Sequence, residues 1–125
     1  MKVTQSDLAD QTVDEAAALG AAAALFRSLG DPNRLAILRH LALGEHRVRD
    51  LTEHLGLAQS TVSAHCLCLA DCGLITGRPE GRSTMYSLAH PELLNLLKEA
   101  ETLLALTGDA VTLCPTFRPN GRKAQ

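Results

Sequence analysis

The stretch Leu51-Thr-Glu-His-Leu-Gly-Leu-Ala-Gln-Ser-Thr-Val-Ser-Ala-His65 decides the fold of this chain. Its first apolar residues recur at helical spacing and predict a short helix from about Arg47 to Leu55. Gly56 then stands where a helix commonly ends in the left-handed conformation. A second helix is expected from Gln59 up to Gly73, and it begins with small hydrogen-bonding side chains. A helix, a turn containing glycine and a helix with a polar start are typical of a helix-turn-helix.

The polar start of the second helix is the candidate DNA-reading surface. In helix-turn-helix proteins the second helix enters the major groove, and its first residues contact base edges. Amide, hydroxyl and imidazole groups can reach base edges or phosphates. The candidate DNA-binding residues of this helix are Gln59, Ser60, Thr61, Ser63 and His65. As an alternative, Ser60 or Thr61 would only cap the helix.

A β-hairpin is expected directly after this helix. Residues 74–76 and 84–88 are rich in β-formers and predict two short strands around a polar turn at 77–83. A hairpin in this position is a wing, and its Arg78 and Arg82 would lie near phosphate or a minor groove. The alternative is a solvated hairpin with incidental charge.

Further helices are expected on both sides of this unit. Thr12-Val-Asp-Glu15 has the form of a capping box, which predicts that a long Ala- and Leu-rich helix starts there and ends at Gly30. Asp31 and the proline after it open the next helix, which runs to about Leu43. The last helix, about 91–106, carries leucines on more than one stripe, and we expect a second copy of the chain to cover one of them.

These elements predict a mainly α fold with a small β-hairpin, a homodimeric winged helix-turn-helix with five helices. A chain of 125 residues is long enough for one compact domain. We expect an N-terminal extension at 1–11, the winged domain at 12–107 and a C-terminal tail at 108–125.

The composition argues against several other classes of protein. No apolar run approaches the roughly 18 residues of a membrane span, and the start has no secretory signal, so we expect a cytoplasmic protein without a membrane partner. No set of nucleophile, base and orienting group indicates an enzyme. The net charge of −2 argues mildly against nucleic acid, although local basic patches can still bind phosphate.

The four cysteines require an explanation, because three of them fall between Cys66 and Cys72. In a reducing compartment such thiols more often serve metal binding or thiol chemistry than structural disulfides. Cys68 and Cys72 are one helical turn apart, so both can reach one ion, and thiolates favour soft metals. Cys66 would point to nearly the opposite side, and we expect it to be a small buried apolar residue. The other histidines besides His65 are expected at the surface or at caps.

The order of elements and four motifs resemble the ArsR/SmtB repressors over about Leu25 to Leu106. The motifs are Leu29-Gly-Asp-Pro-Asn-Arg-Leu35, Leu51-Thr-Glu-His-Leu-Gly-Leu57, Gln59-Ser-Thr-Val-Ser63 and Gly73-Leu-Ile. The resemblance implies a homodimer whose first and last helices form the interface. It also implies repression of metal-resistance or efflux genes until an inducer weakens the hold on double-stranded operator DNA, an imperfect palindrome.

The resemblance also implies where a metal would bind. The arsenic-sensing pattern needs a Cys-Val-Cys run, but here the corresponding stretch, His46 to Asp50, has no cysteine. The zinc-sensing site on the last helix fails because two of its positions hold leucines, Leu103 and Leu106. The remaining pattern is similar to the cadmium- and lead-sensing CmtR type. There, two cysteines on the recognition helix join one from the tail of the other subunit, which here are Cys68, Cys72 and Cys114.

The predicted function is therefore a transcriptional repressor released by Cd²⁺ or Pb²⁺, with Zn²⁺ or As(III) as alternative inducers. The metal would tie the recognition helix to the partner's tail and change the spacing of the two reading heads. Two other functions stay open. One is a thiol redox switch on the same fold, in which Cys68 or Cys72 forms a disulfide. The other is a dimeric protein-interaction module that no longer binds DNA.

Overall fold

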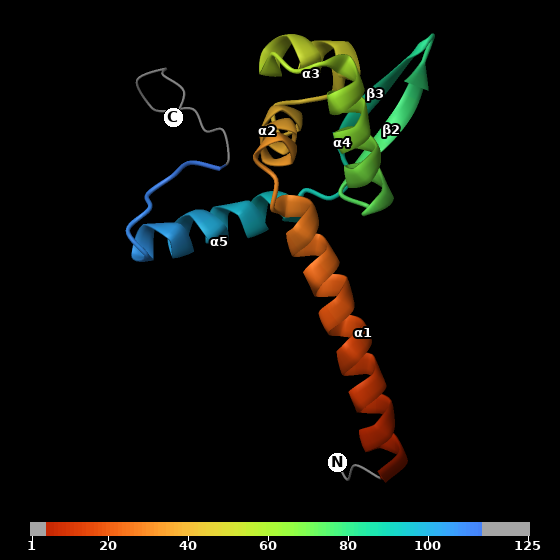
Figure 1. Cartoon of the computed structure of the whole chain (residues 1–125), viewed down its shortest axis with the longest axis vertical. Helices are drawn as coiled ribbons and strands as arrows, with labels where there is room; N and C mark the ends of the chain where they lie inside the picture. The colour runs from red at the N-terminus through yellow and green to blue at the C-terminus, as the bar shows by residue number, and fades with distance from the viewer. Residues whose placement is uncertain (1–4, 114–125) are drawn as a thin grey trace.

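The computed structural model describes residues 5–113, with side chains from residue 14 onward. Within this range it has five helices and three strands, which confirms the mainly α winged helix-turn-helix fold. The elements are α1 (Gln5–Leu29), α2 (Pro32–Leu41), β1 (His46–Arg47), α3 (Val48–Leu55), α4 (Gln59–Asp71), β2 (Ile75–Glu80), β3 (Ser83–Leu88) and α5 (Glu92–Leu106). In Figure 1, α1 projects from a body made of the other elements.

Two predicted helix boundaries are confirmed by their backbone chemistry. The Asp31 side chain accepts hydrogen bonds from the backbone N–H groups of Asn33 at 2.8 Å and Arg34 at 3.2 Å, so it caps α2. Gly56 ends α3 with a φ of 68°, a left-handed conformation that glycine adopts without steric cost. These two signals set where α2 begins and where α3 ends; α2 itself ends at Leu41, two residues before the predicted Leu43.

The start of α1 predicted at Thr12 is wrong. The helix begins at Gln5 and therefore runs into residues 1–11, which the sequence assigned to an extension. Residues 5–19 contain neither Pro nor Gly, so the helix has no reason to stop at the capping-box motif.

The sheet differs from the predicted hairpin in two respects. The strand order is β1-β3-β2, and the short strand β1, which was not predicted, pairs His46 with Tyr86. The residues expected as a polar turn are mostly strand, because β2 and β3 stay paired out to Glu80 and Ser83. The wing is therefore a long hairpin closed by a two-residue turn, in which Gly81 has a φ of 62°.

A single apolar core joins α2, α3, α4, β2, β3 and α5. Its fully buried side chains are Ile37, Leu38, Leu51, Val62, Cys66 and Leu69. Three of these belong to α4, so the recognition helix is anchored along its whole inner face. The burial of Cys66 confirms it as an apolar core residue.

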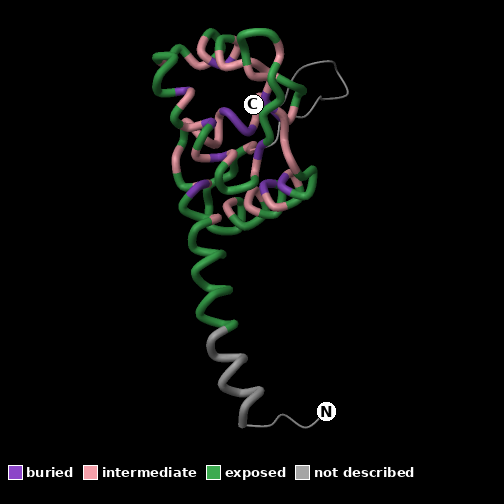
Figure 2. The backbone as a smooth tube through the Cα atoms, turned by 90° about the vertical axis from the view of Figure 1, so that its right-hand side faces the viewer, coloured by how far each residue is buried: buried purple, intermediate pink, exposed green. Residues whose placement is uncertain are grey.

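The body leaves α1 largely uncovered. Residues 14–24 of α1 are exposed, and Figure 2 shows the exposed stretch leading away from the buried residues. Large apolar side chains on α1 and α5 also face solvent, with exposed fractions of 63% for Leu19, 60% for Phe26, 63% for Leu103 and 80% for Leu106. Within residues 5–113, none of the helices combines the length and the apolar character that crossing a membrane would require.

Candidate nucleic-acid interface and thiol site

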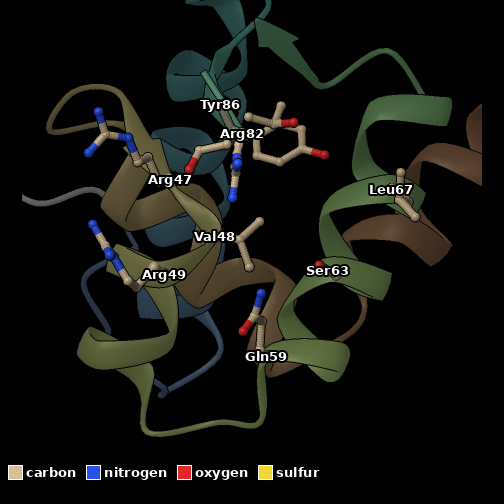
Figure 3. Close-up of a pocket in the computed structure, with 10 residues that line it drawn as sticks. Arg47, Val48, Arg49, Gln59, Ser63, Leu67, Arg82 and Tyr86 are labelled. Atoms are coloured by element: carbon tan, nitrogen blue, oxygen red, sulfur yellow. The ribbon is translucent and has the colours of Figure 1, made fainter. Parts of the chain in front are cut away.

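The outer face of α4 forms one wall of a groove of about 370 Å³. Because Gln59, Ser63 and Leu67 are spaced four apart, they share this face. The other walls come from the start of α3 and from the wing, as Figure 3 shows. Their lining residues are Arg47, Val48, Arg49, Arg82, Ser83, Thr84 and Tyr86. The structure therefore brings together Gln59, Ser63 and Arg82 of the predicted DNA-binding set.

Ser60 and Thr61 lie beside the groove at the start of α4 and are exposed. The N-cap of α4 is Ala58, and no side chain makes a capping hydrogen bond there. The structure thus gives no support to the alternative in which Ser60 or Thr61 caps the helix.

His65 lies away from the groove. Its side chain is only 17% exposed, and its Nε2 is 4.0 Å from Oδ1 of Asp31 at the start of α2. The hydrogen bond from the backbone N–H of Arg34 lowers the pKa of Asp31 below its ordinary value of 3.8 and outweighs partial desolvation, and the charge of His65 lowers it further. His65 therefore contacts the α2 corner of the same chain.

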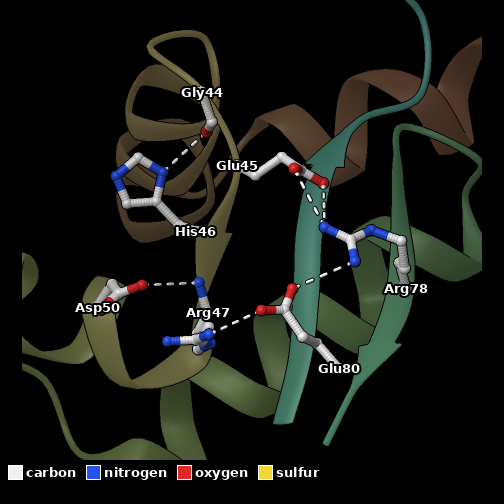
Figure 4. Close-up of polar contacts among 7 residues, drawn as sticks. All are labelled: Gly44, Glu45, His46, Arg47, Asp50, Arg78 and Glu80. Carbon is white, nitrogen blue, oxygen red and sulfur yellow. Dashed lines mark hydrogen bonds and ion pairs between the residues drawn. The ribbon is translucent and has the colours of Figure 1, made fainter.

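The two wing arginines have different surroundings. Arg78 donates to Glu45 at 3.2 Å and pairs with Glu80 at 3.2 Å, and Glu80 also binds Arg47 at 2.9 Å (Figure 4). Two carboxylates thus balance the charge of Arg78. Among the described residues, Arg82 makes no ion pair, so its charge remains available at the tip of the wing.

Arg49 is a basic groove residue that the sequence analysis missed. It is exposed at the start of α3 and, within the part of the chain that the structure describes, forms no ion pair. The strand β1 brings this helix start beside the wing by pairing with β3. The alternation Arg47-Val48-Arg49 was the available signal, but its meaning depends on that unpredicted strand.

The second candidate site is the thiol pair at the other end of α4. The backbone N–H of Cys72 donates to the carbonyl of Cys68 at 3.1 Å, so the two residues are one helical turn apart. Cys68 is half-buried and Cys72 is exposed. Two thiols in this relation fit a soft metal ion that takes at least one further ligand from elsewhere. The predicted third ligand, Cys114, lies outside the described residues.

The other groups around α4 do not complete a metal site. Within residues 14–113, no three His, Cys, Asp or Glu side chains are arranged to hold a metal ion. Burial raises the pKa of the Cys66 thiol to about 11, which disfavours the thiolate that a metal needs. The Cys72 Sγ instead lies 2.8 Å from the hydroxyl oxygen of Ser28 on α1.

Three histidines that look scattered in the sequence pack together. The ring centroids of His40 and His54 are 4.9 Å apart, with planes at 14°, and His46 lies 6.0 Å and 5.6 Å from these two rings. A ring nitrogen of His46 is 2.8 Å from the carbonyl oxygen of Gly44. The packed rings of the three histidines join α2, β1 and α3, and sequence spacing gave no signal for this cluster.

Comparison with known proteins agrees with this geometry. Residues 31–76 match the family described as "Bacterial regulatory protein, arsR family". The "Probable mercury resistance operon repressor" of Streptomyces lividans is 35% identical over 101 residues, which cover 81% of each chain. The "HTH-type transcriptional regulator CmtR" of Mycobacterium tuberculosis is 42% identical over 90 residues, which cover 71% of this chain and 76% of CmtR.

A solved structure shows the same architecture. The homodimeric winged helix-turn-helix DNA-binding domain of Mb0332 from Mycobacterium bovis, described as "a possible ArsR-family transcriptional regulator", aligns with a TM-score of 0.67 and 30% identity. The alignment covers 73% of this chain and 84% of that domain. The chain therefore belongs to the arsR family of bacterial regulatory proteins, and it is a winged helix-turn-helix regulator and not an enzyme.

Proposed function

We propose that this protein is a repressor that binds operator DNA as a homodimer and releases it when a soft metal ion binds Cys68, Cys72 and Cys114. One observation carries the proposal. The helix whose outer face lines the arginine-containing groove also holds the thiol pair at its other end. A ligand at the thiols therefore acts on the element that would read the operator.

The groove supplies the groups that DNA recognition needs. Arg49 and Arg82 flank it with charges that no carboxylate of the described residues balances, and such charges suit backbone phosphates. Gln59 and Ser63 present an amide and a hydroxyl between them, which suit base edges in the major groove. Ser60 and Thr61 extend this polar surface at the start of α4.

The uncovered apolar surface favours a homodimer. Leu19 and Phe26 of α1 and Leu103 and Leu106 of α5 are all at least 60% exposed. The homodimeric Mycobacterium bovis domain has the same architecture. A dimer joined through α1 and α5 places two copies of α4 side by side, which suits the two half-sites of an imperfect palindrome.

The chemistry of the ligands favours a thiophilic inducer. Three thiolates suit Cd²⁺ and Pb²⁺, whereas a structural zinc site usually has four ligands. One relative is named for mercury resistance and another is the regulator CmtR, so Hg²⁺ belongs in the same test as Cd²⁺ and Pb²⁺. When bound, such an ion would cross-link the end of α4 to the chain segment that carries Cys114.

Operator binding with and without metal tests the proposal. A fluorescent duplex from the region upstream of the protein's own gene is titrated at several salt concentrations, and a steep loss of affinity with salt is expected. Cd²⁺, Pb²⁺, Hg²⁺, Zn²⁺ and arsenite are then added separately to the complex. Release by the soft ions supports the proposal. Release only by peroxide, reversed by a thiol reductant, would replace it with the redox switch.

A further inference from the structure

We infer that Ser28 is a positioning residue for the Cys72 sulfur and that their hydrogen bond couples the thiol site on α4 to α1. The inference rests on the proposed function, because α1 is there the dimer helix and Cys72 a metal ligand. It assigns to Ser28 the task of transmitting events at the thiols to the arrangement of the two subunits.

The Ser28–Cys72 contact joins distant parts of the chain. The hydroxyl oxygen and the sulfur are 2.8 Å apart although the residues are separated by 44 positions. Ser28 is 4% exposed, and it is the one buried polar residue of the described range. A buried hydroxyl that loses its partner destabilises the folded state, so the fold favours keeping this bond. The last turn of α1 is thereby held to the end of α4.

The chemistry of the two groups makes the bond sensitive to metal. A thiol can donate its proton to the Ser28 oxygen, and a hydroxyl can rotate to donate or to accept. When Cys72 binds a metal ion, its proton is released to solvent, and the sulfur can then only accept. The Ser28 hydroxyl must therefore become the donor and follow the sulfur. Hydrogen bonds of this kind orient metal ligands.

The end of α1 is also clamped to the start of α2, so it moves as part of a corner. The Arg34 side chain donates from Nε to the Ser28 carbonyl at 2.7 Å and from Nη2 to the Arg27 carbonyl at 3.1 Å. His65 of α4 lies beside Asp31 of the same corner. Besides the apolar core, the Ser28–Cys72 bond and the His65–Asp31 contact thus join α4 and its C-cap to the α1–α2 corner. A shift at Cys72 changes the direction in which α1 leaves the body.

Ser28→Ala is the decisive variant, and Ser28→Thr keeps the hydroxyl. Ser87→Ala on β3 is a matched control, because it removes a serine hydroxyl outside the groove and the thiol site. In metal-free protein, amide hydrogen exchange of residues 25–30 should be several-fold faster in Ser28→Ala than in the wild type. It should be unchanged in Ser87→Ala, and Ser28→Thr should restore most of the protection.

The second readout is the coupling itself. Cd²⁺ binding is followed by the ultraviolet absorption of the cadmium–thiolate bond, and operator affinity is measured with and without Cd²⁺. Allosteric coupling is typically about 5- to 150-fold, and we expect Ser28→Ala to reduce it below about 2-fold while the cadmium–thiolate band remains. Ser28→Thr should keep most of it.

The possible outcomes distinguish a failure of the role assigned to Ser28 from a failure of the proposed function. Operator release by Cd²⁺ that is as large in Ser28→Ala as in the wild type overturns the role of Ser28 and leaves the proposed function intact. If the wild type shows no metal-dependent release, the proposed function fails, while the hydrogen-exchange measurement still decides whether Ser28 holds the two helices together. Equal exchange in all the variants would overturn that contact.

Discussion

The two ends of α4 have opposite surroundings. At its start, Gln59 and Ser63 face a groove with arginines at its rim, and no element of the described range covers it. At its end, Cys72 contacts Ser28 of another helix. Between the ends, Val62, Cys66 and Leu69 are fully buried. One end is thus free to meet a macromolecule, while the other is attached to α1.

This difference shows how a small regulator can separate reading from sensing without a second domain. A helix anchored along its inner face moves as a rigid body, because close-packed side chains transmit displacement. A change at the thiols then reaches the DNA-reading face about two to three helical turns away. The four predictions below test each part of this arrangement, in order of decreasing effect.

The largest effect is expected at the thiol end. Cys68→Ser and Cys72→Ser should each abolish operator release by Cd²⁺ while operator affinity without metal stays close to that of the wild type. The loss of metal affinity should exceed the roughly 10- to 100-fold that removing an outer partner of a ligand costs. Metal titration and fluorescence anisotropy measure the two quantities. Cys66→Ala is the matched control and should still release the operator. If Cys66→Ala loses release, or if Cys68→Ser and Cys72→Ser keep it, the assignment of the ligands is contradicted.

At the reading end, the two wing arginines should behave differently. Arg82→Ala should weaken operator binding and reduce the slope of log affinity against log salt by about 1, because one phosphate contact is lost. Arg49→Ala should do the same. Arg78→Ala should leave the slope unchanged, because Glu45 and Glu80 already balance that charge. An equal change of slope in Arg78→Ala and Arg82→Ala would remove the distinction between them.

The stability contributed by the buried middle of α4, which contains Cys66, should depend on pH in the alkaline range. Burial raises the pKa of Cys66 from an ordinary 9.0 to about 11, so the folded state favours the neutral thiol. This contribution to stability is complete below about pH 9 and is lost as the pH rises through about 11. Urea unfolding should therefore show a smaller alkaline loss of stability in Cys66→Ala than in the wild type. If the free energy of unfolding falls equally with pH in both proteins, ionisation of the buried Cys66 thiol does not cause the alkaline loss of stability.

The smallest effect is expected at the α1–α2 corner. Asp31→Ala should lower the free energy of unfolding, because the two hydrogen bonds that cap α2 are lost. Asp31→Asn should retain most of the cap. The lowered pKa of Asp31 means that its charge stabilises the fold above pH 3.8 and that this contribution is lost as the pH falls through its folded pKa. The acid limb of the unfolding curve should therefore flatten in Asp31→Asn, and an unchanged limb would contradict the prediction.

Local signals in the sequence predicted the local structure well. Asp31 before a proline, Gly56 after an apolar helix and the polar start of α4 each act over a few residues, and each was found where predicted. The start of α1 was missed because the Thr12 motif resembles a cap even where the helix continues through it.

Contacts between distant residues could not be predicted in the same way. Arg49 joins the groove only because β1 pairs with β3, and His65 faces Asp31 only because α4 packs against the start of α2. The Ser28–Cys72 bond likewise depends on how α1 meets α4. Spacing along the chain contains no information about contacts between distant elements, so the thiols could be predicted from the sequence but the partner of Cys72 could not.

The length of α1 has a further consequence for the amount of protein in the cell. The helix has 25 residues, so it is about 37 Å long, and no other part of the described chain covers its residues 14–24. In the proposed dimer a second copy shelters this surface, so its melting temperature should rise with protein concentration. Dilution would then unravel α1 before the body melts. The concentration of the protein in the cell, as well as that of the inducer, would then determine how many operators are occupied.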